Sequence, residues 1–293
     1  MENLTKCPVC DQNILNDFLV CKDHTVSNDD FKLCKCESCG FVFTNPRPEP
    51  HQLGIYYKSE DYISHSNTSK GIVNKIYLLV RNFTLTKKFN LVNGYAKPKK
   101  LLDIGCATGM FLNVCKQKGV DVVGVEPDEN AAQYARSTFG LDVQDEASLA
   151  KFDDNTFDAI TMWHVLEHVP NLNQRVEEIK RLVKPGCFIF IAVPNMASFD
   201  AQFYSDKWAA YDVPRHLYHF NNATMAKLLQ KHGLTLVEKL PMIFDSYYVS
   251  MLSEKYKRGK MNYLQAFLSG RKSNRLAAKN DVNYSSVIYV IKK

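Results

Sequence analysis

The sequence lacks the hydrophobic features that would place a chain in or across a membrane. It contains no run of about 18 or more apolar residues, the length at which a transmembrane helix is indicated. Its first residues, Met1 to Lys6, contain no apolar core of the kind that a secretory signal peptide carries. We therefore expect neither a membrane span nor export, and we expect the protein in the cytoplasm.

The cysteines do not suggest a disulfide framework. The chain has 9 of them, an odd number, and two Cys-x-x-Cys pairs account for four. In an intracellular chain such pairs indicate metal binding rather than disulfide formation. The chain has 293 residues, enough for two domains, and its 45% hydrophobic content is ample for a buried core. We expect a globular protein.

The glycine pattern of residues 101–109 lacks part of the dinucleotide-binding fingerprint. This stretch reads as a buried strand that runs into a tight turn, and Glu126 ends the next apolar run. The third glycine of the fingerprint is missing and Asp103 precedes the first, so no pyrophosphate site is predicted. Gly105 and Gly109 allow the backbone to approach a ligand, and Glu126 can accept hydrogen bonds from both ribose hydroxyls.

The segment Asp103-x-Gly105-x-Ala107-x-Gly109 resembles the first motif of class I S-adenosylmethionine-dependent methyltransferases, with Ala107 where many members have glycine. The resemblance implies an α/β fold with a doubly wound, Rossmann-like, seven-stranded sheet, and S-adenosylmethionine as cofactor. The cofactor-binding residues would be Asp103, Gly105, Ala107, Gly109, Glu126, Pro127, Asp145 and Trp163. Asp145 would contact the adenine amino group, although a solvated turn is nearly as good an interpretation.

Alternating strands and helices support this fold. The predicted strands are 100–104, 120–126, 141–144, 157–163, 187–193, 235–240 and 284–291, and the predicted helices are 108–118, 128–139, 172–183 and 222–232. Lys184-Pro185-Gly186 should stop the helix predicted at 172–183, and Asn221 or Asn222 should cap the helix predicted at 222–232. The predicted domains are a zinc ribbon at 1–48, a linker and helical strap at 49–95, and a methyltransferase domain at 96–293 with a helical insertion at 242–282.

Two knuckle sequences predict a structural zinc site. They are Cys7-Pro-Val-Cys10 and Cys36-Glu-Ser-Cys39-Gly40. Four thiolates complete a tetrahedral zinc and leave no position for water, and the segment is too small for a core of its own. Cys34 shares a strand face with Cys36 and could compete as a ligand, although we expect it to pack. A redox disulfide at either pair is the alternative.

Three tyrosines precede the predicted cofactor-binding turn in the sequence. Tyr56, Tyr57 and Tyr62 either cover the cofactor, because a sulfonium is attracted to an aromatic face, or pack a helical strap onto the core.

His164, Glu167 and His168 follow the strand at 157–163 and resemble a segment of small-molecule and quinone methyltransferases. That resemblance implies that His164 and Trp163 line the methyl-transfer pocket. The alternative is a metal site on His164, Glu167 and His168, as in the small-RNA 2′-O-methyltransferases. We expect no divalent ion in turnover.

The segment from Trp208 to Phe220 is rich in aromatics, Arg and His, a composition typical of a loop that binds the acceptor. It resembles segments of bacterial methyltransferases with Pro-Arg-His, and of sugar C-methyltransferases that carry an N-terminal zinc domain. His216 is the first candidate for the general base, because an imidazole has a pKa near 6.5, and His219 and His164 are the next. Arg215 would bind an acidic or oxygen-rich acceptor. Alternatively, Arg215 and His216 only brace the loop.

The net charge of +6 is concentrated near the C-terminus. Residues 255–279 hold eight Lys or Arg and no acid, interleaved with aromatics. Such a stretch could meet nucleic acid, a nucleotide-linked sugar or an anionic membrane surface, but a solvated helical face is the simpler interpretation. A set of apolar residues there suggests a homodimer contact or a pocket wall, namely Tyr247, Tyr248, Met251, Leu252, Leu264, Phe267 and Leu268.

The sequence leaves three functional hypotheses open, because a fold alone does not determine function. The leading hypothesis is methyl transfer to a small-molecule acceptor that is a sugar, quinone-like or lipid-linked. The second is an RNA or protein methyltransferase that docks through the zinc ribbon and residues 255–279. The third is a binding protein that keeps the fold without catalysis.

Overall fold

A computed structural model describes residues 1–57 and 72–293, and for residues 72–82 it describes the backbone only. The chain packs as two compact units, each built from separate stretches of sequence. The first consists of Met1–Ser64, Leu166–Asn173 and Ala192–Tyr289, and the second of His65–Val165, Gln174–Ile191 and Val290–Lys293. These units do not follow the predicted domain boundaries, which stay a prediction because packing alone does not show which segments fold independently.

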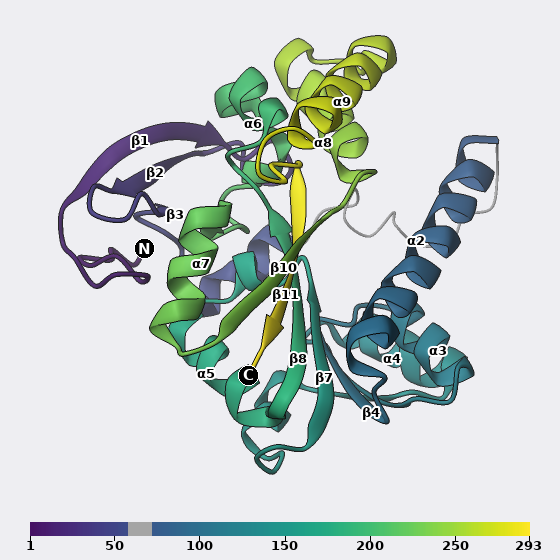
Figure 1. The fold of residues 1–293 in the computed structure, drawn as a ribbon. Coiled ribbons are helices and arrows are strands. Elements are labelled where there is room, and N and C mark those ends of the chain that lie inside the picture. Colours follow the sequence, from purple (N-terminus) through teal and green to yellow (C-terminus); the bar gives the residue numbers. More distant parts are fainter. Residues whose placement is uncertain (58–71) are drawn as a thin grey trace. The chain divides into compact units, whose positions relative to one another are not determined.

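A seven-stranded sheet confirms the predicted fold class (Figure 1). Its strands have the order β10-β11-β8-β7-β4-β5-β6. They are β4 (Lys100–Ile104), β5 (Asp121–Val125), β6 (Asp142–Gln144), β7 (Phe157–Trp163), β8 (Val183–Pro194), β10 (Thr235–Pro241) and β11 (Ser286–Lys292). In the second unit β4 pairs in parallel with β5 and β7, and β5 pairs in parallel with β6, as strand–helix alternation predicts.

Most strand boundaries differ from the prediction by no more than two residues, but one strand begins four residues early. The strand predicted at 187–193 begins at Val183, directly after the preceding helix, so Lys184-Pro185-Gly186 lies in β8 and not before it. The pairing partner explains the difference. The backbone N–H of Gly186 donates to Lys293 O at 3.2 Å and the N–H of Lys293 donates to Cys187 O at 3.1 Å, so the last residue of the chain extends the ladder.

The helices around the parallel strands lie close to their predicted positions. They are α2 (Ile72–Ala96), α3 (Met110–Gln117), α4 (Glu129–Phe139) and α5 (Leu172–Leu182). The side chain of Asp128 caps α4 by accepting from the backbone N–H of Ala131. Leu101 and Leu102 of β4 are fully buried, as expected for a central strand covered on both faces. Tyr62 lies outside the described residues.

The first unit contains a four-stranded antiparallel sheet that the sequence did not predict as one element. Its strands are β1 (Leu15–Lys22), β2 (Asp30–Cys36), β3 (Val42–Thr44) and β9 (Tyr218–His219), in the order β1-β2-β3-β9. The last strand comes from the predicted acceptor-binding loop, and Phe43 pairs with Tyr218. The fully buried Phe41 ring packs against Tyr218 and Phe220.

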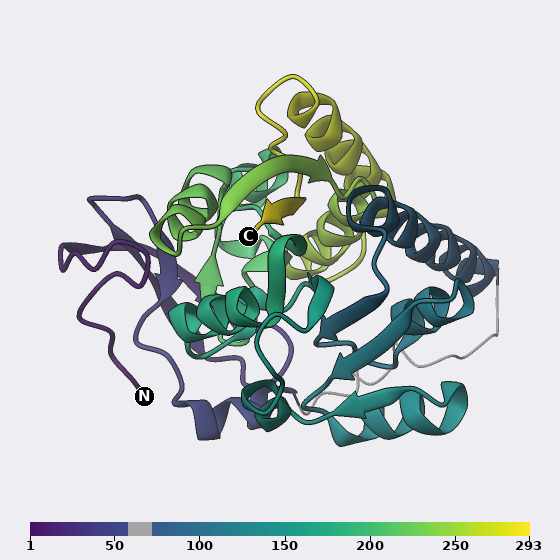
Figure 2. The same cartoon turned by 60° about the horizontal axis from the view of Figure 1, so that its bottom comes forward.

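The predicted helical insertion consists of two helices, α8 (Asp245–Arg258) and α9 (Tyr263–Ala277), which pack against each other (Figures 1 and 2). The same unit holds α6 (Phe199–Tyr204) and α7 (Asn222–Lys231). Asn221 is the cap of α7, in a reciprocal capping box with Thr224. Short 3-10 segments lie at Pro50–Tyr57, Glu146–Ala150, Leu166–His168, Ser205–Lys207 and Ala209–Tyr211. Among residues 1–57 and 72–293, no helix is long and apolar enough to cross a membrane.

Candidate functional site

The turn after β4 depends on its two glycines. Gly105 and Gly109 have φ angles of +72° and +73°, in the left-handed region, and Ala107 has a φ of +47°. A Cβ on Gly105 would lie 2.4 Å from Val165 Cγ2, and one on Gly109 would lie 2.6 Å from Leu141 Cδ1. Both positions therefore exclude any side chain, and α3 begins directly after them.

Glu126, at the end of β5, holds this turn in place. One carboxylate oxygen accepts from the backbone N–H of Ala107 at 2.8 Å, and the other accepts from the N–H of Asp128 at 2.9 Å. Burial raises the pKa of this carboxyl above its ordinary value. A carboxylate has about four lone-pair sites, so Glu126 retains acceptor capacity for two ribose hydroxyls beyond the two backbone donors. Its position fits the nucleoside of S-adenosylmethionine.

Asp103 is a buried acid in β4. It is 2% exposed, and its Oδ1 accepts from the hydroxyl of Thr161 at 2.6 Å. Burial raises its pKa to about 7, so near neutral pH it is close to its protonation midpoint. A positively charged group placed beside it would favour the ionised form. That property fits the ammonium group of the methionine part of the cofactor.

The remaining predicted cofactor residues lie at the ends of neighbouring strands. Trp163 ends β7, with the Phe111 ring at 5.5 Å and Lys88 Nζ 4.4 Å above its own ring. Asp145 follows β6, where its side chain accepts from the N–H of Ser148 and caps a 3-10 segment. Pro127 is exposed. These contacts do not test whether Trp163, Asp145 and Pro127 bind the cofactor, so that role stays a prediction.

The four predicted metal-ligating cysteines converge. Cys7 and Cys39 have their sulfur atoms 3.5 Å apart, Cys10 and Cys36 are equally close, and all four sulfurs lie within 4.8 Å of one another. Cys34 is not in this cluster, because its thiol is directed to Asn45 O. This cluster is compatible with the predicted tetrahedral zinc.

Side chains of α7 hold the two knuckles. Lys227 Nζ donates to Cys39 O at 3.3 Å, and Lys231 Nζ donates to Pro8 O at 3.2 Å. Gly40, with a φ of +78°, lets the chain leave the second knuckle. The cysteine cluster therefore packs within the first unit, as does the sheet that β9 completes.

Arg215 is fixed within the first unit. It is 3% exposed, its Nε and Nη2 donate to both oxygens of Asp212, and its Nη1 donates to Tyr56 O at 2.9 Å. Asp23 lies 3.7 Å from the same guanidinium. These bonds match the bracing interpretation of Arg215 more closely than a free acceptor-binding group. The sequence assigned no role to the paired carboxylate, Asp212. Its position four residues before His216 is the signal that could have identified it.

His216 has a defined proton arrangement. A backbone carbonyl only accepts, so Nδ1 carries the proton that is donated to Ala210 O at 2.9 Å. Nε2 is then the basic nitrogen, and it lies 3.8 Å from Asp212 Oδ2. A histidine ring with one unprotonated nitrogen can accept a proton from an acceptor, so this tautomer is compatible with the predicted role of general base.

His168 packs against His216, with ring centroids 4.5 Å apart. Burial, followed by the charge of His216, lowers the pKa of His168 to about 4, so the ring is neutral at physiological pH. Its Nδ1 lies 3.0 Å from the Tyr57 hydroxyl and 3.2 Å from Arg215 O. Potential ligand atoms of Glu167, His168 and His216 lie within 4.8 Å of one another, so His216 takes the place that the alternative metal hypothesis gave to His164.

His219 is placed differently from His216. It is 4% exposed on β9, where its Nε2 lies 3.2 Å from the hydroxyl of Thr44 in β3. Its ring contacts Tyr211 edge to face, and burial lowers its pKa to about 3. These surroundings are those of a side chain that joins two strands. His164, in the second unit, has a φ of +60° at the turn after β7.

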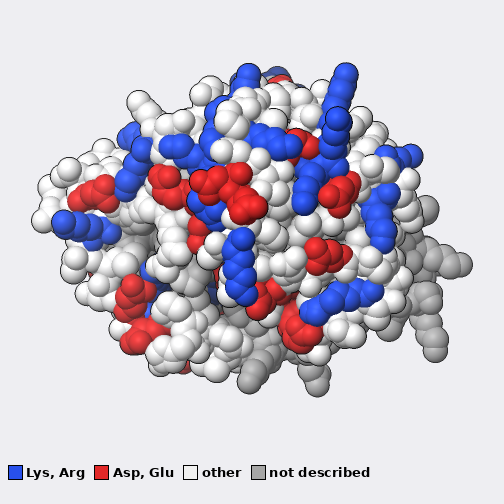
Figure 3. Space-filling model, turned by 90° about the horizontal axis from the view of Figure 1, so that it is seen from below, with Lys and Arg blue, Asp and Glu red and all other residues white. Residues whose placement is uncertain are grey.

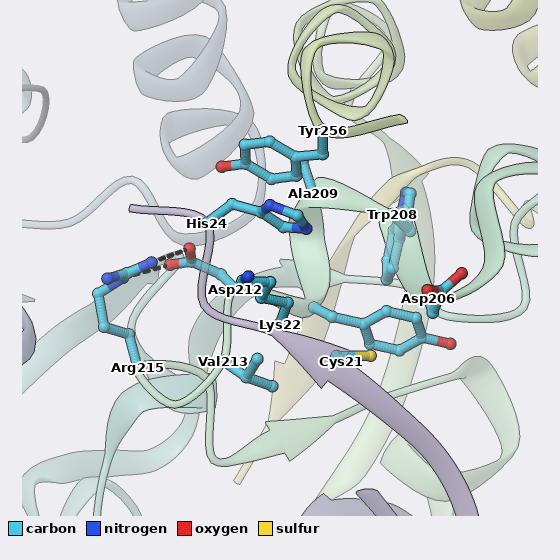
Figure 4. A pocket seen from close by; sticks show the side chains of 11 residues that line it. Cys21, Lys22, His24, Asp206, Trp208, Ala209, Asp212, Val213, Arg215 and Tyr256 are labelled. Carbon is cyan, nitrogen blue, oxygen red and sulfur yellow. Dashed lines mark hydrogen bonds and ion pairs between the residues drawn. The ribbon is translucent and has the colours of Figure 1, made fainter. Parts of the chain in front are cut away.

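A pocket lies beside Arg215 in the first unit (Figure 4). Its wall includes Trp208, the first residue of the predicted acceptor-binding segment, and His24, whose ring stacks on Tyr256 with centroids 4.3 Å apart. Trp208 is held by the hydrogen bond from its indole N–H to Asp200 at 2.8 Å. The polar lining comes from both acidic and basic groups, including Lys22, Asp206, Asp212 and Arg215.

Comparison with known proteins places these features in one class of enzyme. Residues 82–239 match the model of the methyltransferase domain family. The chain belongs to this family and is an S-adenosylmethionine-dependent methyltransferase of class I. The hypothesis of a binding protein without catalysis is therefore not favoured.

Sequence relatives include enzymes of one biosynthetic route. The chain is 32% identical over 161 residues to the ubiquinone biosynthesis O-methyltransferase of Azoarcus sp. strain BH72, a match that covers 50% of this chain and 69% of that protein. The enzyme of the same name from Alkalilimnicola ehrlichii is 32% identical over 110 residues, covering 35% of this chain and 44% of that protein. The second match thus spans less than half of its relative.

A solved structure supports the fold. An S-adenosylmethionine-dependent methyltransferase from Thermotoga maritima, described as a possible histamine N-methyltransferase, superposes with a TM-score of 0.52 at 19% identity. The match covers 76% of this chain and 96% of that one. This likeness establishes the shared fold, and it does not extend to the acceptor.

Proposed function

We propose that this methyltransferase acts on a hydroxyl of a small, quinone-like acceptor, with a sugar or a lipid-linked molecule as the other members of the predicted class. The names of the sequence relatives support the quinone-like acceptor. The observation that carries the chemistry is the pairing of His216 with Asp212, because a phenolic hydroxyl must lose its proton as it attacks a methyl carbon.

The proposed roles follow from the contacts of each side chain. Bound S-adenosylmethionine supplies a methyl carbon on a sulfonium that is open to displacement. Glu126 would accept from the ribose while its bond to the backbone of Ala107 holds the turn. Asp103, whose Oδ1 accepts from Thr161, would favour the ammonium group of the methionine part. His216 Nε2 receives the acceptor proton, and Asp212 stabilises the resulting imidazolium. Trp163 and His164 line the methyl-transfer pocket.

The cysteine cluster is proposed to hold one structural Zn²⁺ on Cys7, Cys10, Cys36 and Cys39. The supporting observation is that four sulfurs from two knuckles meet in a segment that packs as part of the first unit. A tetrahedral site of four thiolates stabilises structure and leaves no position for a reacting group.

The acceptor class can be tested with S-adenosylmethionine carrying a labelled methyl group. Purified protein would be incubated separately with a catechol or hydroquinone series, with nucleotide-linked sugars and with bulk RNA. Label in the catechol products, lost in His216→Ala, is the expected result. Label in RNA would instead favour the second hypothesis, in which the ribbon and residues 255–279 dock a macromolecule. Label in the sugars alone would reject the quinone-like acceptor.

A further inference from the structure

Helix α9 carries its large apolar side chains on the side that faces solvent. Leu264 is 71% exposed and Phe267 is 52% exposed, and Tyr263 and Leu268 are exposed beside them. Positions 264, 267 and 268 share one helical face because side chains three and four residues apart are neighbours. Exposed apolar residues scattered singly need no explanation, but four of them on two successive turns form a contiguous patch.

The covered side of α9 is made of small residues. Ala266, Ser269, Gly270, Ser273 and Ala277 are buried. A Cβ on Gly270 would lie 2.8 Å from the Tyr247 ring and 3.0 Å from the Tyr247 Cα, so α8 and α9 approach too closely for a larger residue there. The large side chains of α9 therefore lie beside this close contact and not within it. The Phe267 ring stacks on the Tyr247 ring of α8 with centroids 5.6 Å apart and is still 52% exposed.

The exposed face becomes basic in the next turns. Arg271, Lys272 and Arg275 are exposed on the same side as the apolar patch, and residues 255–279 contain no acid. Other parts of the surface differ, because acidic and basic side chains are interspersed on the face in Figure 3. The outer face of α9 thus combines a large apolar group with adjoining positive charge.

We propose that the outer face of α9 binds an anionic lipid surface, with Tyr263, Leu264, Phe267 and Leu268 inserted at the level of the headgroups. Interfacial helices have this composition, with apolar and aromatic side chains that enter the lipid and Lys or Arg that meet anionic headgroups. This inference goes beyond the proposed function, because lipid binding requires neither cofactor nor acceptor. It provides a means by which the enzyme reaches an acceptor that resides in lipid.

Two other occupants fit the same face less well. A second copy of the chain, apposed through this face, would bring Arg271 and Arg275 of both copies into one interface, and like charges repel. A nucleic acid would pair with the basic side chains and could stack bases on Tyr263 and Phe267, but it would leave the aliphatic Leu264 and Leu268 in contact with water. A lipid surface accommodates the apolar patch and the positive charges together.

The inference is tested by sedimentation of the full-length protein with vesicles. Vesicles of equal parts phosphatidylglycerol and phosphatidylcholine should bind the protein, and pure phosphatidylcholine should bind it at least tenfold more weakly, because each basic residue near an anionic surface contributes about 1 kcal/mol. Leu264→Ser with Phe267→Ser should weaken binding to the anionic vesicles by about tenfold or more. Arg271→Gln with Arg275→Gln should do the same, and the difference from wild type should shrink in high salt.

The matched control replaces exposed apolar residues elsewhere, Ile14→Ser with Val237→Ser, and should bind vesicles like the wild type. Affinity for S-adenosylmethionine should be unchanged in every variant, which separates loss of lipid binding from loss of folding. Equal binding to both kinds of vesicle, or no binding to either, would overturn the proposal. So would a wild-type dimer in analytical ultracentrifugation that Leu264→Ser with Phe267→Ser converts to monomer. The vesicles contain no acceptor, so a failed methyl-transfer assay does not affect this result.

Discussion

Replacing Glu126 by Ala should weaken binding of S-adenosylmethionine by about 10- to 150-fold. A hydrogen bond to a charged group is worth about 1.5–3 kcal/mol, and each 1.4 kcal/mol is a factor of ten in affinity. The upper part of the range is expected, because Glu126 also accepts from the backbone N–H groups of Ala107 and Asp128, and its removal frees the turn that should contact the cofactor.

Isothermal titration calorimetry with S-adenosylmethionine measures this loss directly. Glu126→Gln should lie between wild type and Glu126→Ala, because the amide keeps one acceptor oxygen but loses the charge and places an NH₂ group opposite a backbone donor. The matched control is Glu129→Ala, which removes an exposed carboxylate three residues along the chain, paired with Arg136 on the surface. It should change the affinity less than about twofold. Unchanged affinity in a folded Glu126→Ala protein would refute the assignment of the ribose to Glu126.

Four further predictions address the other groups. Metal analysis of protein purified without chelator should find about one zinc per chain, and Cys7→Ser with Cys36→Ser should reduce it to near zero; substantially less than one zinc in the wild type would reject the site. His216→Ala should lower turnover by about 10²- to 10⁴-fold at unchanged cofactor affinity. A chelator that removes other divalent ions while the cysteine-bound zinc remains should leave turnover intact, and inhibition would favour metal ligation by Glu167, His168 and His216. Asp103 has a folded-state pKa raised to about 7, so the folded protein keeps a proton that the unfolded chain has released at lower pH. Its contribution to stability is therefore complete below about pH 4 and is lost as the pH rises to about 7. Asp103→Asn should remove a decrease on the order of 2 to 4 kcal/mol between pH 4 and 8, measured by urea unfolding, and an identical pH profile in both proteins would contradict this.

The sequence by itself determined the features that depend on local chemistry. Gly105 and Gly109 occupy left-handed backbone conformations next to side chains that exclude a Cβ, and the glycine spacing indicated this turn. Strand β7 coincides with its predicted span of 157–163, because a continuous apolar run bounded by turn residues is typical of a buried parallel strand. The two Cys-x-x-Cys pairs likewise predicted which four sulfurs converge, since each pair forms within a few residues.

Only the tertiary structure decided the surroundings of the acceptor-binding loop. Thr44 donates its hydroxyl hydrogen to His216 O, and Val42 pairs with His219, so the ribbon and the loop form one sheet from segments far apart in the chain. Such pairing leaves no local signal. The tertiary structure distinguished His219, which joins two strands, from His216, whose Nε2 faces Asp212.

Packing also decided which side of α9 is covered. From the sequence, the large residues Leu264, Phe267 and Leu268 were candidates for a pocket wall or a homodimer contact. In the structure the small residues of this helix face α8, because the close approach at Gly270 admits nothing larger. A helical pattern shows which residues share a face, but the neighbouring helix determines whether that face is buried.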